Sequence, residues 1–266
     1  MGVELTILGS GSGGNAAYLE CGKTRILIDA GLSGKQIRDR LLKINRSPEM
    51  LSGIIISHEH NDHIEGLAVI AAKLGIPVYT NRLTSEGILE KFDKKFCFKI
   101  FQSGESFEIG DIEVEVFSVP HDAVDPIGFT FITNSGKIGY VTDIGCVTAL
   151  TAERIRLAQV LVVESNHDVE MLQNDPHRPW SLKQRILGKH GHLSNESAAE
   201  LIERTITDNL QHITLAHLSQ ECNRPELAVK VVSNKLQSIG ARHITVRAAS
   251  QDKPAPTVRL DNGKVV

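Results

Sequence analysis

The sequence predicts an α/β protein built as four layers, in the order helix, sheet, sheet, helix (αββα). Short β runs separated by glycines open the chain, and mixed strands and helices then recur in two halves. No proline-rich linker or low-complexity segment separates these halves, and 266 residues, 41% of them hydrophobic, can bury a large core. We therefore expect one domain over residues 1–250 and a polar, proline-containing, weakly ordered tail at 251–266.

The individual elements follow from the hydrophobic pattern. The runs 53–57, 160–164 and 213–216 are so apolar that both faces of these strands must be covered. The expected strands are 3–8, 16–21, 24–29, 53–57, 77–80, 99–101, 106–109, 112–119, 128–133, 138–142, 160–164, 213–216 and 243–248. Apolar residues at helical spacing predict helices at 34–44, 64–74, 85–91, 181–189, 194–207 and 225–239.

Composition argues against several classes of protein. A formal charge of −3 is an ordinary soluble balance and not that of a general nucleic-acid binder. No stretch approaches the roughly 18 apolar residues of a membrane helix, and the first residues lack the pattern of a secretion signal, so we expect a cytoplasmic protein without a membrane partner. The cysteines form no CxxC pair, which disfavours a thiolate zinc site and a disulfide framework.

The glycines at 9, 11 and 14 satisfy the GxGxxG pattern of dinucleotide-binding proteins, with Asp29 about twenty residues further on. That motif must open a helix whose N-terminus receives the pyrophosphate. Here the following residues, 16–29, read as a hairpin with its turn at Gly22-Lys23. We therefore interpret the glycines as a tight loop, beside which Asn15 could line a site at the sheet edge.

The segment HEHNDH, residues 58–63, lies between a buried strand and a helix. In extended backbone, His58, His60 and Asp62 project to the same side, and the start of the helix brings His63 round to join them. Imidazole and carboxylate groups suit zinc, manganese or iron. Four potential ligands in six residues are too concentrated for an ordinary polar surface loop, so the segment predicts a metal site.

A metal needs more than two protein ligands, so further ligands should follow other strands. His121, Asp143 and His217 each come directly after an expected strand, at the end of a sheet where sites collect. Taken singly each could be an ordinary loop residue, but together with HEHNDH they support one another.

The order HxHxDH, His121, Asp143 and His217 resembles the metallo-β-lactamase fold superfamily over nearly the whole chain. The resemblance implies an αββα fold with two divalent metal ions per chain, Zn or Mn and possibly Fe, in the cleft between the sheets. It further implies one ion held by His58, His60 and His121, a second held by Asp62, His63 and His217, and Asp143 as a bridge. Two ions sharing a bridging hydroxide would hydrolyse a phosphodiester or an activated ester or amide.

Glu164 ends the strand 160–164, and His192 precedes the helix at 194–207. This pair resembles that of ribonuclease Z and the β-CASP nucleases, where such a glutamate orients such a histidine to protonate the leaving oxygen. An alkoxide needs a general acid far more than a thiolate does, which favours phosphodiester over thioester cleavage. Alternatively, Glu164 only ends a strand and Ser194 acts as a helix N-cap. The predicted catalytic residues are Asp62, Glu164 and His192.

Finer motifs resemble the small, single-domain YycJ/WalJ group. The matching segments are SGSGGN at 10–15, HEHNDH, TDIG at 142–145, ESNHD at 164–168, RPWSLKQRI at 178–186, GHLSN at 191–195 and AHLS at 216–219. This resemblance implies 5′-to-3′ exonuclease action on DNA and a role in mismatch repair. The chain lacks the glycine-rich insertion with which ribonuclease Z grips tRNA, and residues 143–217 are too few to hold a β-CASP domain.

Candidate substrate contacts lie near these motifs. Residues 23–46 and the stretch containing Arg178 and Lys183 are locally basic and could follow a phosphate backbone, although most charge runs are merely solvated faces. Trp180 could stack on a terminal base or anchor its loop. The full predicted set of contacts is Asn15, Asn166, His167, Arg178, Trp180 and Lys183. Asp29 is expected to support a ligand histidine.

Three alternatives remain open at this stage. A related enzyme could hydrolyse a small phosphodiester or a thioester, a ribonuclease Z-like enzyme could process RNA, and a scaffolding protein could keep the metals for stability. The sequence leaves open the metal identity, the polarity of digestion and the oligomeric state.

Overall fold

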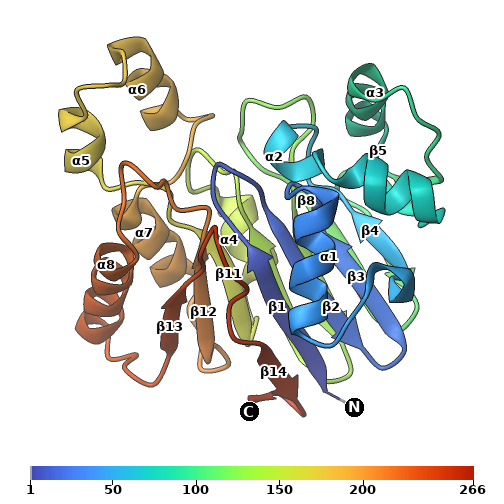
Figure 1. Cartoon of the computed structure of the whole chain (residues 1–266). Helices are drawn as coiled ribbons and strands as arrows, with labels where there is room; N and C mark the ends of the chain where they lie inside the picture. Colours follow the sequence, from blue (N-terminus) through green and yellow to red (C-terminus); the bar gives the residue numbers. More distant parts are fainter. Residues whose placement is uncertain (1) are drawn as a thin grey trace.

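The computed structural model describes residues 2–266 as two sheets packed face to face, with helices outside them (Figure 1). The first sheet has the order β15-β14-β1-β2-β3-β4-β5-β6. Its strands are β1 (Val3–Gly9), β2 (Ala16–Cys21), β3 (Thr24–Ile28), β4 (Gly53–Ile55), β5 (Val78–Asn81), β6 (Phe98–Phe101), β14 (Val258–Asp261) and β15 (Lys264–Val265). The second sheet has the order β13-β12-β11-β10-β9-β8-β7. Its strands are β7 (Ser106–Ile109), β8 (Ile112–Ser118), β9 (Ile127–Thr133), β10 (Gly136–Val141), β11 (Val160–Glu164), β12 (His212–Ala216) and β13 (Thr245–Ala248).

The helices form the two outer layers, and in Figure 1 α1 to α3 lie on one side of the sheets and α7 and α8 on the other. The α-helices are α1 (Gly34–Lys43), α2 (Asn61–Ile64), α3 (Arg82–Lys91), α4 (Ala149–Ile155), α5 (Val169–Asn174), α6 (Trp180–Leu187), α7 (Asn195–Thr205) and α8 (Pro225–Ser238). A 3₁₀ turn at Pro48–Met50 and a π-helical segment at Ala68–Ala72 complete the set.

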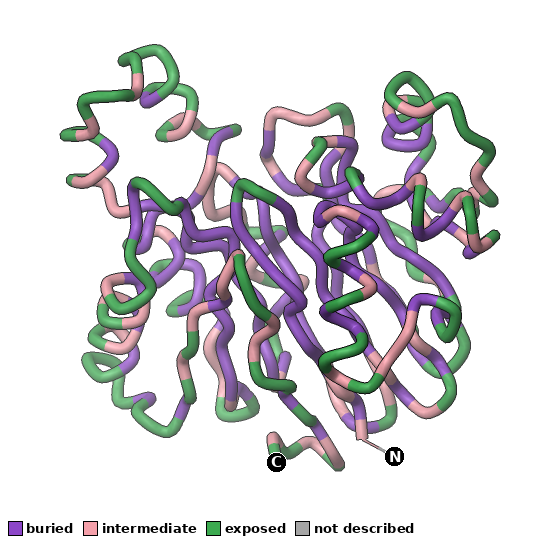
Figure 2. The backbone as a smooth tube through the Cα atoms, viewed as in Figure 1, coloured by how far each residue is buried: buried purple, intermediate pink, exposed green. Residues whose placement is uncertain are grey.

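Three apolar clusters separate the layers and confirm the four-layer prediction. The central cluster joins the facing sides of the two sheets, with Phe129 and Phe131 of β9 among its fully buried side chains. A second cluster packs α4, α7 and α8 onto the second sheet, and a third packs α1 onto the first. Buried residues therefore fill the strands, and exposed residues lie mainly on the outer helices and turns (Figure 2).

Strand direction brings the predicted site residues to one edge. Strands β3 to β5 are parallel to one another, as are β10 to β12. Strand β8 runs in the same direction as β10, because both are antiparallel to β9. Asp29 and His58 follow the carboxyl ends of β3 and β4 in one sheet. In the other sheet, His121, Asp143 and His217 follow β8, β10 and β12, and Glu164 is the last residue of β11.

The C-terminal segment differs from the expected weakly ordered tail. Strand β14 pairs with β1, β15 pairs with β14, and the amide of Ala255 donates to the carbonyl of Ile7 over 2.8 Å. Gln251 also holds the glycine loop, accepting from the Gly13 amide and donating to the Gly14 carbonyl. The polar, proline-containing composition hid these strands, because only Val258 and Leu260 mark their buried face.

Other differences concern the helices. The expected helix at 64–74 is interrupted by a turn at 65–66, where the Gly66 amide donates to the carbonyl of Ala30 instead of continuing the helix. Helices α4 and α5 were not expected; each is short and begins with a side-chain cap, from Thr148 and from Asp168. Strands β2 and β3 form the hairpin expected after the glycine loop, so the GxGxxG pattern does not open a helix. Among residues 2–266, no helix is both long and apolar enough to cross a bilayer.

Gly31 lets the loop after β3 touch the HEHNDH turn, and its replacement by alanine should destabilise the fold. A Cβ at this position would lie 1.5 Å from the carbonyl oxygen of Asp62. We expect Gly31→Ala to cost about 1–3 kcal/mol or more, because a backbone atom must move. That cost corresponds to a fall in melting temperature of roughly 2–4 °C per kcal/mol. Gly188→Ala is the matched control, since its Cβ would approach no atom closer than 3.2 Å. Equal melting temperatures for the two variants would contradict this account.

Candidate metal centre and active site

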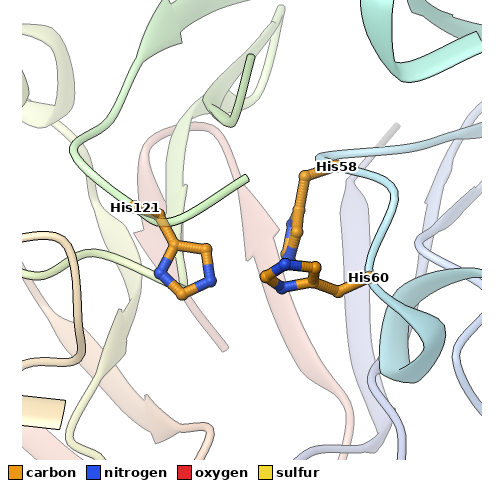
Figure 3. Close-up of side chains that lie close together, drawn as sticks. All are labelled: His58, His60 and His121. Carbon is orange, nitrogen blue, oxygen red and sulfur yellow. The ribbon is translucent and has the colours of Figure 1, made fainter. Parts of the chain in front are cut away.

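Three histidines form the first cluster at the shared edge (Figure 3). His58 follows β4, His60 precedes α2 as its N-cap residue, and His121 lies in the loop after β8. Their ring centroids are 4.6 Å apart for His58 and His60, 5.1 Å for His60 and His121, and 5.2 Å for His58 and His121. The first sheet therefore supplies two imidazoles and the second sheet supplies one.

Asp62, His63, Asp143 and His217 form a second cluster, in which one potential ligand atom from each residue lies within 4.8 Å of the others. Asp62 Oδ2 is 3.3 Å from His217 Nε2, and Asp143 Oδ2 is 3.1 Å from His63 Nε2. Asp143 Oδ1 is also 3.7 Å from His121 Nε2 of the first cluster. Asp143 thus lies between the two clusters, where a bridging carboxylate would have to be.

The donor atoms fit divalent metal ions. His58 and His121 bond through Nδ1, to Ser57 Oγ at 3.0 Å and to the Gly191 carbonyl at 3.0 Å. Within residues 2–266, the buried Nε2 atoms of both histidines have no hydrogen-bond partner, and Oδ2 of Asp143 lies 3.1 Å from His63 Nε2 without hydrogen-bond geometry. A buried polar atom without a partner is costly, and such ring nitrogens at one place fit the ligand set of a metal ion. Histidine and carboxylate groups are ligands for zinc, manganese or iron.

The supporting contacts set which nitrogen of each histidine faces the site. Asp29 Oδ2 accepts from His63 Nδ1 over 2.8 Å, as the sequence analysis expected of Asp29. Ser57 Oγ contacts Asp29 Oδ2, His58 Nδ1 and His63 Nδ1, a role that the sequence did not predict for this residue. The sequence feature that could have indicated this contact is a small hydroxyl residue directly before the HxH motif. Such partners fix the tautomer and the ring orientation of metal ligands.

Burial and the neighbouring charges shift the pKa values of the residues in the two clusters. Burial, then the neighbouring His63, lowers the pKa of His58 well below its ordinary value. Burial alone would lower the pKa of His63, but the carboxylates of Asp143 and Asp29 raise it well above its ordinary value. Burial would raise the pKa of Asp143, yet His217 and His63 lower it far below. The protein therefore supplies carboxylates that are ionised at neutral pH, ready to offset cationic charge.

Glu164 connects the second cluster to His192. Its Oε1 accepts from Nδ1 of His192 over 2.8 Å and from Nδ1 of His217 over 2.7 Å. Its Oε2 accepts from the amides of Ile144 and Leu193, each over 3.0 Å. Burial would raise the pKa of Glu164, but His192 and His217 lower it to about 2. The contact with His192 is the one predicted from the sequence, whereas the contact with His217 was not predicted.

Left-handed backbone marks three residues that end strands at this edge. Asp29, Asp143 and His217 have φ angles of 57°, 54° and 56°. Residues other than glycine adopt this conformation at a cost of about 1–3 kcal/mol, and such residues gather at functional sites. In this conformation the side chains of all three residues contact residues of the second cluster.

The predicted substrate contacts lie in different surroundings. Asn166 and Arg178 line a pocket beside His192. Asn15 is buried instead, with Nδ2 3.1 Å from His63 Nε2 and 3.4 Å from Asp62 Oδ2, so it contacts the metal cluster. Trp180 is 59% exposed at the start of α6.

Two of the predicted contacts are placed differently from what the sequence suggests. Lys183 is buried, and its Nζ donates to the carbonyls of Gln173 and Asp175, because the lysine must fix the turn between α5 and α6. His167 is also buried, and burial lowers its pKa to about 4, so it offers no surface cation for a phosphate.

The comparisons with known proteins agree with this geometry. Residues 24–213 match the β-lactamase superfamily domain. The chain is 43% identical over 241 residues to exodeoxyribonuclease WalJ of Streptococcus pneumoniae, covering 89% of each chain. It is 42% identical over 245 residues to exodeoxyribonuclease YycJ of Bacillus anthracis, covering 90% of this chain and 91% of the relative.

Solved structures share the fold at low sequence identity. The metallo-β-lactamase fold protein YhfI from Bacillus subtilis has a TM-score of 0.72 at 17% identity, with 96% of this chain and 98% of that chain covered. The short form of human tRNase Z has a TM-score of 0.62 at 20% identity, with 82% of this chain and 93% of that chain covered. The chain therefore belongs to the metallo-β-lactamase superfamily and, within it, to the group of WalJ and YycJ.

Proposed function

We propose that this chain is a dinuclear metal-dependent phosphodiesterase that digests DNA from the 5′ end toward the 3′ end. The observation that carries the proposal is the Glu164–His192 pair, 2.8 Å apart, at the border of the second cluster. A hydrolase of poor leaving groups needs such an acid. The names of the relatives from Streptococcus pneumoniae and Bacillus anthracis support deoxyribonucleic acid as the substrate.

The assignment of ligands is part of this proposal. One ion, Zn²⁺ or Mn²⁺, would be held by His58, His60 and His121, and a second by Asp62, His63 and His217, with Asp143 shared. When bound, two such ions supply a nucleophilic water at neutral pH and positive charge opposite the attacked phosphate.

The side chains of the protein provide the proton transfer that the reaction also requires. In the hydrolysis, the oxygen of water forms a new bond to phosphorus, the bond from phosphorus to the leaving oxygen breaks, and one proton ends on that oxygen. His192 supplies this proton. Burial would lower the pKa of His192, but the Glu164 carboxylate raises it above its ordinary value, which favours the protonated imidazole. Cations bound nearby would oppose this effect, which makes the glutamate necessary.

The test of the proposal is digestion of end-labelled DNA and RNA by the purified protein after EDTA treatment and readdition of Mn²⁺ or Zn²⁺. We expect metal-dependent shortening of DNA from its 5′ end. Preferential digestion of RNA, or hydrolysis only of a cyclic nucleotide or of lactoylglutathione, would replace this function by one of the alternatives. Inactivity with all these substrates and metals would favour a scaffolding role. A cytoplasmic location and a role in DNA repair belong to the same proposal.

Glu164→Gln should weaken both metal binding and turnover. The carboxylate accepts four hydrogen bonds, two at each oxygen, and a glutamine must turn its NH₂ group toward one pair of donors. Because His217 loses its support, we expect metal affinity to fall by about 10–100-fold, as for other residues that orient metal ligands. The affinity is measured by competition with a chromogenic chelator.

Glu153→Gln is the matched control, because Glu153 is an exposed acid on α4 with 75% of its side chain accessible. If Glu164→Gln bound metal as tightly as the wild type, Glu164 would not be needed to position His217.

A further inference from the structure

A pocket of about 240 Å³ opens beside His192, outside both metal clusters. It lies between α6 and the loops that follow β1, β11 and β12. Its polar wall contains Ser12, Asp122, Asn166, Arg178, Arg185, His192 and Ser219. The volume falls just below the roughly 300–1,000 Å³ of pockets for drug-sized ligands, which is the size class of a single nucleotide.

The position of His192 indicates which part of the substrate would occupy the pocket. If His192 protonates the leaving oxygen, the group that departs must lie on the His192 side of the attacked phosphorus. The pocket is on that side, since His192 is part of its wall. In 5′-to-3′ digestion the departing group is the terminal nucleotide, released through its 3′ oxygen. The pocket is thus placed to hold that nucleotide.

The two arginines supply charge at the pocket. Arg178 is paired with Asp175 and Glu221, which holds its guanidinium in place with 22% of the side chain exposed. Arg185 on α6 is paired with Asp122 alone and is 64% exposed, so it can exchange this partner for another anion. A guanidinium fork matches the geometry of a phosphate. A terminal phosphate is the most anionic part of a nucleotide and its natural partner here.

The remaining wall has a different character. Leu182 and Ile186 of α6 face the pocket and give it an apolar side. Sugar and base atoms can pack there without base-specific hydrogen bonds, and the serine hydroxyls can bond the phosphate. The pocket therefore combines an anion site with an apolar wall that tolerates any base.

From this arrangement we infer that the pocket binds the 5′-terminal nucleotide through its 5′-phosphate, so that the enzyme prefers phosphorylated ends and releases one nucleotide per cut. The inference rests on the proposed function and adds the form of the DNA end. Each cut transfers the oxygen of water to the next phosphorus and leaves the shortened strand with a new 5′-phosphate. A strand that begins with a hydroxyl should therefore be slow only at its first cut.

The test compares two single-stranded DNA oligonucleotides of one sequence, with a 5′-phosphate or a 5′-hydroxyl, each labelled at the 3′ end and, separately, throughout. The rate of the first cut gives kcat/KM for each end, and the uniform label gives the size of the product. We expect mononucleotides and a clear preference for the phosphorylated strand. Arg185→Ala should reduce the preference by on the order of tenfold, the effect of one charge-assisted hydrogen bond.

Arg178→Ala should reduce the preference similarly, but Arg178 also ties α6 to its neighbours, so Arg185→Ala is the variant that carries the test. Arg204→Ala on the outer face of α7 removes an exposed, acid-paired arginine far in sequence from the pocket and should keep the preference. Equal rates on the two ends, larger products, digestion from the 3′ end, or an unchanged preference in Arg185→Ala would overturn the inference. Failure to digest either strand would instead contradict the proposed function.

Discussion

Asp143→Asn should reduce DNA hydrolysis by on the order of 10³-fold and cost the protein bound metal. Asp143 lies between the two clusters, it is 3% exposed, and we propose that it bridges the two ions. An asparagine keeps the shape but removes the negative charge that would offset two cations. Losing several kcal/mol of metal-dependent stabilisation, at about 1.4 kcal/mol per factor of ten, lowers turnover by on the order of 10³-fold.

The measurement is the initial rate on end-labelled DNA, together with metal content by mass spectrometry. Asp208→Asn, at an exposed turn after α7, is the matched control and should behave as the wild type. An Asp143→Asn enzyme with two bound metals and normal turnover would show that this carboxylate is not shared between ions.

His192→Ala should reduce turnover on ordinary DNA by about 10²–10⁴-fold, the usual contribution of a positioned general acid. Metal content should stay unchanged, because the proposed ligand sets do not include His192, which is connected to them through Glu164. The leaving oxygen would then depart as an alkoxide without a proton.

A substrate with a sulfur in place of the leaving 3′ oxygen separates this role from a structural one. A thiolate leaves without protonation, so His192→Ala should cleave the sulfur-containing strand at a rate near that of the wild type. His190→Ala is the control, since His190 is an exposed histidine two residues away. Equal losses on the oxygen and sulfur substrates would mean that His192 shapes the site and transfers no proton.

Much of the fold could be predicted because the central strands carry an unambiguous signal. The run VLVVE at 160–164 is buried at every position in β11, and HITLA is buried at every position in β12. The final strands were missed because β14 contributes only two apolar residues, and its order comes from pairing with β1, at the other end of the chain. Pairing partners so far apart leave no local pattern.

The predicted metal ligands come together because each follows a strand that ends at the same edge. The sequence also indicated the pairing of Glu164 with His192. It could not show that Lys183 is buried by the turn between α5 and α6, or that Arg185 pairs with Asp122 across the cleft. Such contacts depend on how a short helix is placed over the sheets, and amphipathic spacing leaves that placement open.

Counting the metal ions bound to the intact protein by native mass spectrometry tests the central claim most directly. We predict two divalent ions per chain in the wild type. His121→Ala should retain one, because the first cluster is reduced to His58 and His60 while the second keeps its full set. A wild-type protein that binds no ion or only one after incubation with excess Zn²⁺ or Mn²⁺ would contradict the account.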